Sequence, residues 1–181
     1  MTKPLLALLL MIVPLGAQAR DWQVDAAKSS LGFTAVYDGE SFDGRFAKFT
    51  AAIRYDAADP ASGRFDVTVD TASVTTRNDE RDESLTGSDF FDVARFPKAH
   101  FQTTAFTVGA DGGVTAEGTL TIRDRSRPVR LKVVFAETGA TATLDVETTL
   151  QRTDFDLGAG SDWSDVGKDV VVKGHLVLSG G

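Results

Sequence analysis

The densest group of chemically active side chains lies in residues 75–97, TTRNDERDESLTGSDFFDVARFP, which include the only Asn of the chain. Paired carboxylates can share acid and base roles, as in glycoside hydrolysis. Most of the carboxylates here would fall on one short surface helix, so the pattern favours a solvated charged face. The residues concerned are Asp79, Glu80, Asp82, Glu83 and Asp89.

Nucleophilic catalysis finds little support elsewhere in the chain. The sequence has two histidines, His100 and His175, and no cysteine. A hydrolase needs a nucleophile, a base and an orienting group. Neither histidine stands in a G-x-S-x-G or H-E-x-x-H frame. His100 lies at the start of an expected strand, and His175 lies inside the last one. Structural roles are favoured for both, and we assign no catalytic residue.

A calcium site is the metal alternative, because Asp162, Asp165 and Asp169 could supply the oxygen ligands that calcium takes. Their spacing departs from the D-x-[DN]-x-[DN]-G loop. Solvated turn aspartates explain them better, and we assign no metal and no cofactor.

Most of the chain alternates apolar and polar side chains with a period of two, which is typical of half-buried β-strands. Turns rich in Gly and Asp separate the segments, and this predicts an all-β sandwich or barrel. We expect Gly44 to kink one long strand and residues 124–128 to form a turn. The expected strands are 31–35, 42–55, 65–69, 101–108, 114–122, 129–135, 141–150 and 170–178, with a short edge piece at 22–24.

One segment breaks the period of two. Residues 77–87 contain almost no β-branched residue, Asn78 or Asp79 can cap their start, and Gly87 can end them. The segment predicts a short helix, which Leu85 and the aromatic residues after it would dock.

The first nineteen residues differ in character from the rest. Lys3 precedes an apolar run from Leu5 to Leu15, and Ala17-Gln18-Ala19 has the form of a cleavage site. This predicts a secretory signal peptide over residues 1–19 and a periplasmic domain over residues 20–181. An uncleaved membrane anchor is the alternative, but the run is shorter than the about 20 residues of a spanning helix.

The net charge and the aromatic content restrict the classes of partner and ligand further. A net charge of −7 disfavours nucleic acid and anionic membrane surfaces as broad partners. Twelve Phe and two Trp would either fill the core of a small barrel or line one ligand cavity. Composition leaves both cases open. A long apolar ligand needs few directional contacts, which fits the lack of a catalytic motif.

Four stretches carry a specific resemblance: DWQVD, SFDGRFAKFTAAIRYD, VDTASVTTRNDERDESLTGSDFFDVARFPKAHFQTT and GTLTIRDRSRPVRL. In this order they resemble the YceI-like family of bacterial periplasmic polyisoprenoid-binding proteins over nearly the whole mature chain. The most specific part is T-x-x-x-x-R-D-x-x-L-x-x-x-D-F-F-D-x-x-x-F-P-x-A-x-F, from Thr76 to Phe101. The motif positions carried over are Asn78, Arg81, Asp82, Leu85, Asp89, Phe90, Phe91, Asp92 and Pro97.

The resemblance implies an eight-stranded antiparallel lipocalin-like barrel with one short helix near one end. It also implies an apolar cavity for a polyisoprenoid or a similar amphiphile, such as a quinone tail, a prenyl phosphate or a fatty acyl chain. The lipocalin G-x-W signature is absent before Trp22. An acidic residue that the family often has near Gly174–His175 is absent too, which bears on head-group chemistry.

The expected role is therefore a periplasmic carrier and not an enzyme. The helix would plug one end of the barrel, with Arg81 paired to a nearby carboxylate. Phe90 and Phe91 would point inward as pocket wall or as core, and the motif does not distinguish the two. The residues expected to contact the ligand are Phe33, Phe46, Phe49, Arg81, Leu85, Phe90, Phe91 and Phe101.

Two other functions stay open from sequence alone. One is an enzyme that acts on a lipid-like substrate through His100, His175 or the carboxylates. The other is a stress-related structural protein with a filled barrel. For the carrier, the expected partners are an isoprenoid or other long-chain lipid and an inner-membrane, quinone-linked protein. An exposed edge on the short first strand would favour a homodimer.

Overall fold

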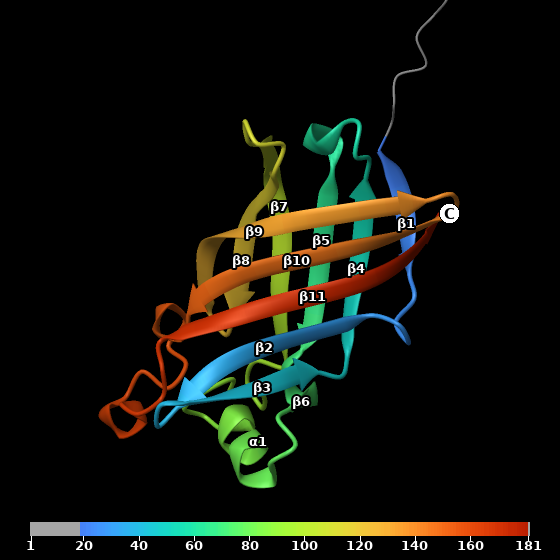
Figure 1. The fold of residues 1–181 in the computed structure, drawn as a ribbon. Helices are drawn as coiled ribbons and strands as arrows, with labels where there is room; N and C mark the ends of the chain where they lie inside the picture. Colours follow the sequence, from blue (N-terminus) through green and yellow to red (C-terminus); the bar gives the residue numbers. More distant parts are fainter. Residues whose placement is uncertain (1–18, 181) are drawn as a thin grey trace, which may run out of the picture.

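The fold is seen in a computed structural model that describes residues 19–180. The predicted signal peptide lies outside the described residues, apart from Ala19. Eleven strands join in one antiparallel sheet (Figure 1). They are β1 Arg20–Val24, β2 Ser30–Tyr37, β3 Glu40–Phe46, β4 Phe49–Tyr55, β5 Arg64–Asp70, β6 Val74–Thr75, β7 Lys98–Val108, β8 Val114–Ile122, β9 Arg125–Thr138, β10 Thr141–Gln151 and β11 Asp169–Gly180. The helices are α1 Asp79–Thr86 and four short 3-10 turns, η1 Pro60–Ser62, η2 Thr71–Ser73, η3 Arg152–Phe155 and η4 Ser161–Trp163.

Eight of these strands close into a barrel, as the resemblance implied. The ring runs β1-β4-β5-β7-β8-β9-β10-β11 and returns to β1. Strand β1 pairs with β4 on one side and with β11 on the other, so it closes the barrel. The expectation that it forms an exposed edge is wrong, and the argument for a homodimer from that edge loses its basis.

The barrel is extended at one end because β11 has two successive neighbours on its side away from β10. Its last residues, Leu178–Gly180, pair with β1, whereas Val171–His175 pair with β2. The sheet continues from β2 through β3 to β6. We call these three strands the flange. Helix α1 lies beside it at the lower end of the barrel in Figure 1.

The expected long strand over residues 42–55 is two strands. The chain turns at Ala47 and Lys48, whose backbone N–H groups donate to the carbonyl and the hydroxyl of Ser73, at 3.0 Å each. This corner sends β3 to the flange and β4 to the barrel. Gly44 does not kink the strand, because it lies inside β3 in register with Phe33.

The expected turn over residues 124–128 is also shorter than predicted. Only Arg123 and Asp124 form it, with Arg123 in the left-handed region at a φ of 56°. Strand β9 starts at Arg125 and holds Pro128 opposite Thr119 of β8. Strand β10 pairs with β9 only from Lys132 onward, so this part of β9 is an edge, where proline is tolerated.

Two hydrophobic clusters fill the interior. The first lies in the closed part of the barrel and includes Trp22, Tyr55, Phe65 and Leu144, none more than 4% exposed. Here the Tyr55 ring meets three phenylalanine rings, with centroids 4.9 to 5.7 Å apart. The second lies against α1 and includes Leu85, Phe90, Phe91, Phe155 and Leu157.

Helix α1 agrees with the predicted segment and is fixed by side-chain caps. The Asn78 side chain accepts from the Arg81 N–H at 2.9 Å, and Gly87 ends the helix. Asp82 accepts from the backbone N–H and the hydroxyl of Thr76 at 2.6 and 2.7 Å. Burial alone would raise the pKa of Asp82, but these hydrogen bonds lower that pKa below its usual value.

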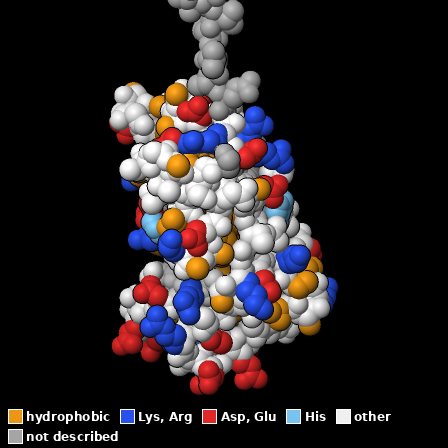
Figure 2. All heavy atoms as spheres, turned by 90° about the vertical axis from the view of Figure 1, so that its right-hand side faces the viewer, with side chains coloured by type: hydrophobic (Ala, Val, Ile, Leu, Met, Phe, Trp, Pro, Cys, Tyr) orange, Lys and Arg blue, Asp and Glu red, His pale blue; other side chains and the backbone are white. Residues whose placement is uncertain are grey.

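The surface mixes charges of both signs. Figure 2 shows Lys and Arg interspersed with Asp and Glu over one face, and acidic side chains at its lower end. Helix α1 lies at that end and exposes Asp79, Glu80 and Glu83. Between residues 19 and 180, no helix has the length and apolar content needed to cross a membrane.

Trp22 should be a principal support of the closed barrel. Its ring is 4% exposed, and its Nε1 donates to the Tyr55 carbonyl at 3.0 Å. Trp22→Ala should lower the free energy of unfolding by about 3–5 kcal/mol, as for other buried aromatic residues. Urea unfolding followed by circular dichroism measures this. Val134→Ala, at an exposed position, should change it by less than about 0.5 kcal/mol. Equal midpoints for the two variants would contradict the role of Trp22.

Asp82 should make stability depend on pH. Its folded-state pKa is lowered, so the carboxylate stabilises the fold above the unfolded pKa of about 3.9. That contribution disappears as the pH falls through the lower folded-state value. Asp82→Asn keeps an oxygen acceptor but does not titrate. The stability difference between wild type and variant should therefore shrink between about pH 6 and pH 3 in denaturant titrations. A constant difference over that range would refute the assignment.

Candidate functional site

A cavity of about 420 Å³ lies between the flange, α1 and the adjoining end of the barrel. Its volume is in the range of small-ligand pockets, about 300–1,000 Å³. Strands β2, β3 and β11 provide Phe33, Ala35, Tyr37, Phe42, Phe46, Val170 and Val172. The segment around α1 provides Asn78, Glu80, Arg81, Ser84, Leu85, Phe90 and Phe91. The rest of the wall is Ile122, Leu150, Arg152, Phe155, Leu157, Trp163 and Val166.

The flange turns one aromatic face toward the cavity. Phe33, Ala35 and Tyr37 follow the period of two along β2, so they share one face. Phe33 meets Phe46 with ring centroids 5.9 Å apart. Gly44 stands opposite Phe33, and a Cβ at that position would clash with the Phe33 ring. Gly44 is therefore needed to leave room for this cavity wall.

The turn after α1 directs two phenylalanines inward. The Phe91 N–H donates to the Leu85 carbonyl at 3.0 Å, and the Asp92 N–H to the Gly87 carbonyl at 2.8 Å. Asp92 is in the left-handed region at a φ of 47°. Phe90 and Phe91 are 6% and 8% exposed, belong to the second cluster and line the cavity. They are core and pocket wall at once.

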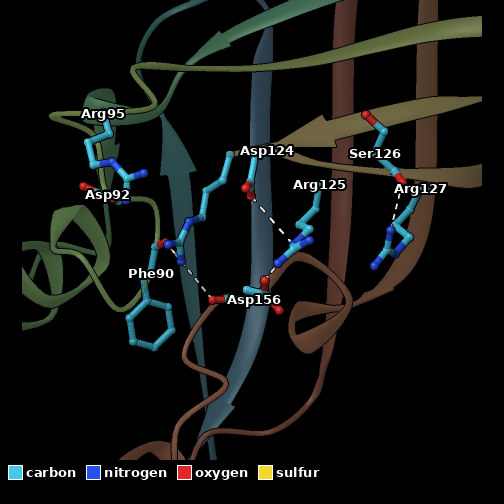
Figure 3. A network of polar contacts seen from close by, with 9 residues as sticks. Phe90, Asp92, Arg95, Asp124, Arg125, Ser126, Arg127 and Asp156 are labelled. Atoms are coloured by element: carbon cyan, nitrogen blue, oxygen red, sulfur yellow. Dashed lines mark hydrogen bonds and ion pairs between the residues drawn. The ribbon is translucent and has the colours of Figure 1, made fainter.

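Polar contacts tie this turn to the barrel, as Figure 3 shows. Arg123 donates from Nη1 to the carbonyls of Phe90 and Asp156, at 3.2 and 3.0 Å. Arg125 donates from Nε to the Asp156 carboxylate at 2.7 Å. On the other side of the turn, Arg95 forms an ion pair of 3.2 Å with Asp92. The hydrogen bond from Arg123 holds the Phe90 carbonyl, and the other two contacts hold Asp156 and Asp92 on either side of it.

A buried arginine shapes the opposite wall. Arg152 is 6% exposed and forms no ion pair among residues 19–180. Its Nε, Nη1 and Nη2 donate to backbone carbonyls of the loop that follows η3. Burial lowers the pKa of the guanidinium from its usual value. The acceptors are Leu157 at 2.7 Å, Gly158, Trp163 at 2.9 Å, Val166 at 2.7 Å and Gly167 at 3.0 Å.

Trp163 belongs to the same loop and closes the wall against α1. Its Nε1 donates to the Asp89 carboxylate at 3.1 Å, and its ring packs edge-on against Phe90 at 4.7 Å. Trp163 was not among the residues that the sequence predicted to contact the ligand. Over the described part of the chain, no three potential metal ligands gather, Asp162 and Asp165 included.

Arg81 lies at the cavity without the carboxylate partner that was expected. Its guanidinium stacks on the Phe42 ring, 4.1 Å from the centroid. It takes part in no ion pair within residues 19–180, so the expected pairing is wrong. Of the two acids adjacent to it in sequence, Glu80 and Asp82, the carboxylate of Asp82 is engaged by Thr76 instead.

The structure separates the eight residues that were expected to contact the ligand. Phe33, Phe46, Arg81, Leu85, Phe90 and Phe91 all line the cavity. Phe49 and Phe101 belong to the first cluster in the closed part of the barrel. The chain corner at Ala47 and Lys48 accounts for Phe49, because it moves that ring from the flange to the barrel.

The histidines stand apart from the cavity and from one another. His100 on β7 contacts the Asp66 carboxylate at 2.8 Å, and His175 on β11 contacts that of Asp145 at 2.6 Å. Both side chains are 45% exposed, and neither lines the cavity. The hydrogen bond from His100 contributes most to lowering the pKa of Asp66. Each pair joins neighbouring strands of the outer barrel surface.

The chain is similar to known proteins in sequence and in fold. The YceI-like domain family matches residues 22–178. A UPF0312 protein of Shewanella sp. strain W3-18-1 is 34% identical over 190 aligned positions, covering 96% of this chain and 98% of that protein. The crystal structure of Burkholderia cenocepacia BcnA matches with a TM-score of 0.81 at 32% identity, covering 86% of this chain and 99% of that one.

A more distant structure shares the fold. A polyisoprenoid binding domain from Saccharophagus degradans matches with a TM-score of 0.68 at 17% identity, covering 91% of this chain and all of that one, 100%. The family match therefore spans nearly all of the barrel, the flange and the segment around α1. The chain belongs to the YceI-like family.

Proposed function

We propose that this protein is a periplasmic carrier that holds one long-chain amphiphile, of the polyisoprenoid class or similar, in the cavity beside α1. The observation that carries the proposal is the cavity itself. Its wall is aromatic and aliphatic over most of its extent, and five phenylalanines from three segments, β2, β3 and the turn after α1, converge on it. They are Phe33, Phe42, Phe46, Phe90 and Phe91, with Phe155 on the opposite side.

The energetics of apolar burial suffice for such a ligand. Each buried CH₂ group contributes about 0.8 kcal/mol. A chain of about ten carbons therefore supplies about 8 kcal/mol, which corresponds to a micromolar Kd before ordering costs. The walls are held by Arg123 and Arg152 through backbone carbonyls. A preorganised wall reduces the ordering cost that the protein has to meet on binding.

Two further observations support the proposal. The Saccharophagus degradans domain, described as polyisoprenoid binding, has the same fold, although at 17% identity the likeness is one of fold alone. The family pattern favours a binding protein over an enzyme. The position of His100 and His175 outside the cavity agrees with a non-enzymatic role.

Filling the cavity should weaken binding without unfolding the protein. Ala35 is a buried wall residue of β2, and Ala35→Phe places a ring in the cavity. We expect affinity for geranylgeraniol, measured by fluorescence titration, to fall by at least about tenfold. Phe90→Ala removes a wall side chain and should also weaken binding, by more than it lowers the stability of the apo protein.

Phe65→Ala is the matched control for these variants. It removes a ring from the first cluster and should cost about 3–5 kcal/mol of stability. The fraction that stays folded should bind geranylgeraniol normally. Wild-type affinity in Ala35→Phe would show that the ligand does not use this cavity. If Phe90→Ala strongly lowers the stability of the apo protein while its folded fraction binds geranylgeraniol with wild-type affinity, Phe90 is a core residue and does not contact the ligand.

The periplasmic location has its own test. If residues 1–19 are a signal peptide, protein isolated from the periplasmic fraction should begin at Arg20. N-terminal sequencing or intact mass measures this. A full-length chain retained in the membrane fraction would contradict cleavage and would show that residues 1–19 anchor the protein to the membrane.

A further inference from the structure

We propose that the cavity selects chains that end in an anionic head group, a phosphate or a carboxylate, with Arg81 as the residue that contacts it. This inference rests on the proposed function and adds the chemical class of the head group. It starts from the charges in the cavity wall. Two arginines, Arg81 and Arg152, line the cavity, against one acid, Glu80, in a chain whose net charge is −7.

Arg81 has donors available for a ligand. A guanidinium carries five N–H donors in a planar fork. The guanidinium lies over the Phe42 ring, 4.1 Å from its centroid, and this cation–π contact leaves N–H groups that can bind an anion. Within residues 19–180, the Arg81 side chain makes no ion pair and no hydrogen bond, and only its backbone N–H is bonded, to Asn78. Asn78 and Ser84 add polar groups to the same part of the wall.

Arg152 adds a positive charge to the cavity wall but has no free N–H donor to contact a ligand. Its donors are committed to carbonyls of the loop that follows η3. Its positive charge nevertheless lies beside an apolar cavity, with no carboxylate paired to it in the described chain. Charges act more strongly in a low-dielectric cleft than in water, and a cleft lined by one sign concentrates ions of the other. The two arginines therefore both favour an anionic ligand in this cavity, and only Arg81 has N–H donors left to contact it.

The acidic surface around α1 does not cancel this effect. Glu80 is exposed, and so are Asp79 and Glu83 on the outer side of the helix. Figure 2 shows acidic side chains at this end of the molecule. Exposed charges are screened over about 8 Å at physiological ionic strength. These surface charges slow the association of an anionic ligand. The affinity for the head group depends on the half-buried Arg81.

Four dodecyl amphiphiles with one tail and different heads test the proposal: laurate, dodecyl phosphate, dodecanol and dodecylamine. Isothermal titration calorimetry at pH 8 and below micelle formation gives each Kd. Laurate and dodecyl phosphate should bind at least about tenfold more tightly than dodecanol, and dodecylamine should bind most weakly. If both anions bind, recognition is of the charge. If only one binds tightly, that head group is the one selected.

Arg81→Gln should bring the two anions to the affinity of dodecanol and leave dodecanol itself unchanged. Arg81→Glu should reverse the order and favour dodecylamine. Arg45→Gln is the matched control, because Arg45 is an exposed residue of β3 outside the cavity and the substitution changes net charge equally. Circular dichroism checks that each variant is folded, and Arg81→Lys keeps the charge should Gln impair folding.

The outcomes separate the two proposals. Equal affinities for all four amphiphiles, or equal effects of Arg81→Gln and Arg45→Gln, would overturn the head-group assignment and leave the carrier in place. If the folded protein binds none of the four and no geranylgeraniol, the carrier itself is refuted.

Discussion

Strand β11 changes its neighbour from β1 to β2 along its length, and this change shapes both parts of the interior. One strand cannot pair with β1 and β2 at the same residues, so the sheet closes at one end of β11 and diverges into the flange at the other. Closure gives a barrel part that its own side chains fill. Divergence leaves the inward face of the flange facing α1 and the turn after it, and the cavity lies between them. The hollow is thus a result of strand pairing and not of missing side chains.

The two hydrophobic clusters have different roles: the first stabilises the fold, and the second surrounds the cavity. The first cluster, around Tyr55 and Phe65, buries a continuous set of rings and supports the fold. The second cluster can then keep unfilled space, because it is not the sole source of stability. Its walls are positioned by polar groups that lie behind the apolar surface. Arg123 holds the carbonyl of Phe90, and Arg152 holds the loop that carries Trp163.

Most of the secondary structure could be predicted from the sequence, because it depends on residues close together in the chain. Alternation of side chains located most strands, and Asn78 and Gly87 located α1, because both signals depend on near neighbours in sequence. Pairing across the sheet left no such signal. The apolar pattern runs on through Phe46 and Phe49, although the corner between them sends the two rings to different clusters. Arg152 was missed because its partners are backbone carbonyls, which every sequence contains.

The mass of the intact protein, isolated from the periplasmic fraction, shows whether the cavity holds a lipid. Native mass spectrometry after gentle purification should show one added mass, equal to a single long-chain lipid, which organic extraction removes and identifies. A mass equal to that of the polypeptide alone, both as purified and after incubation with isoprenoids, would contradict the claim that the space beside α1 holds a chain.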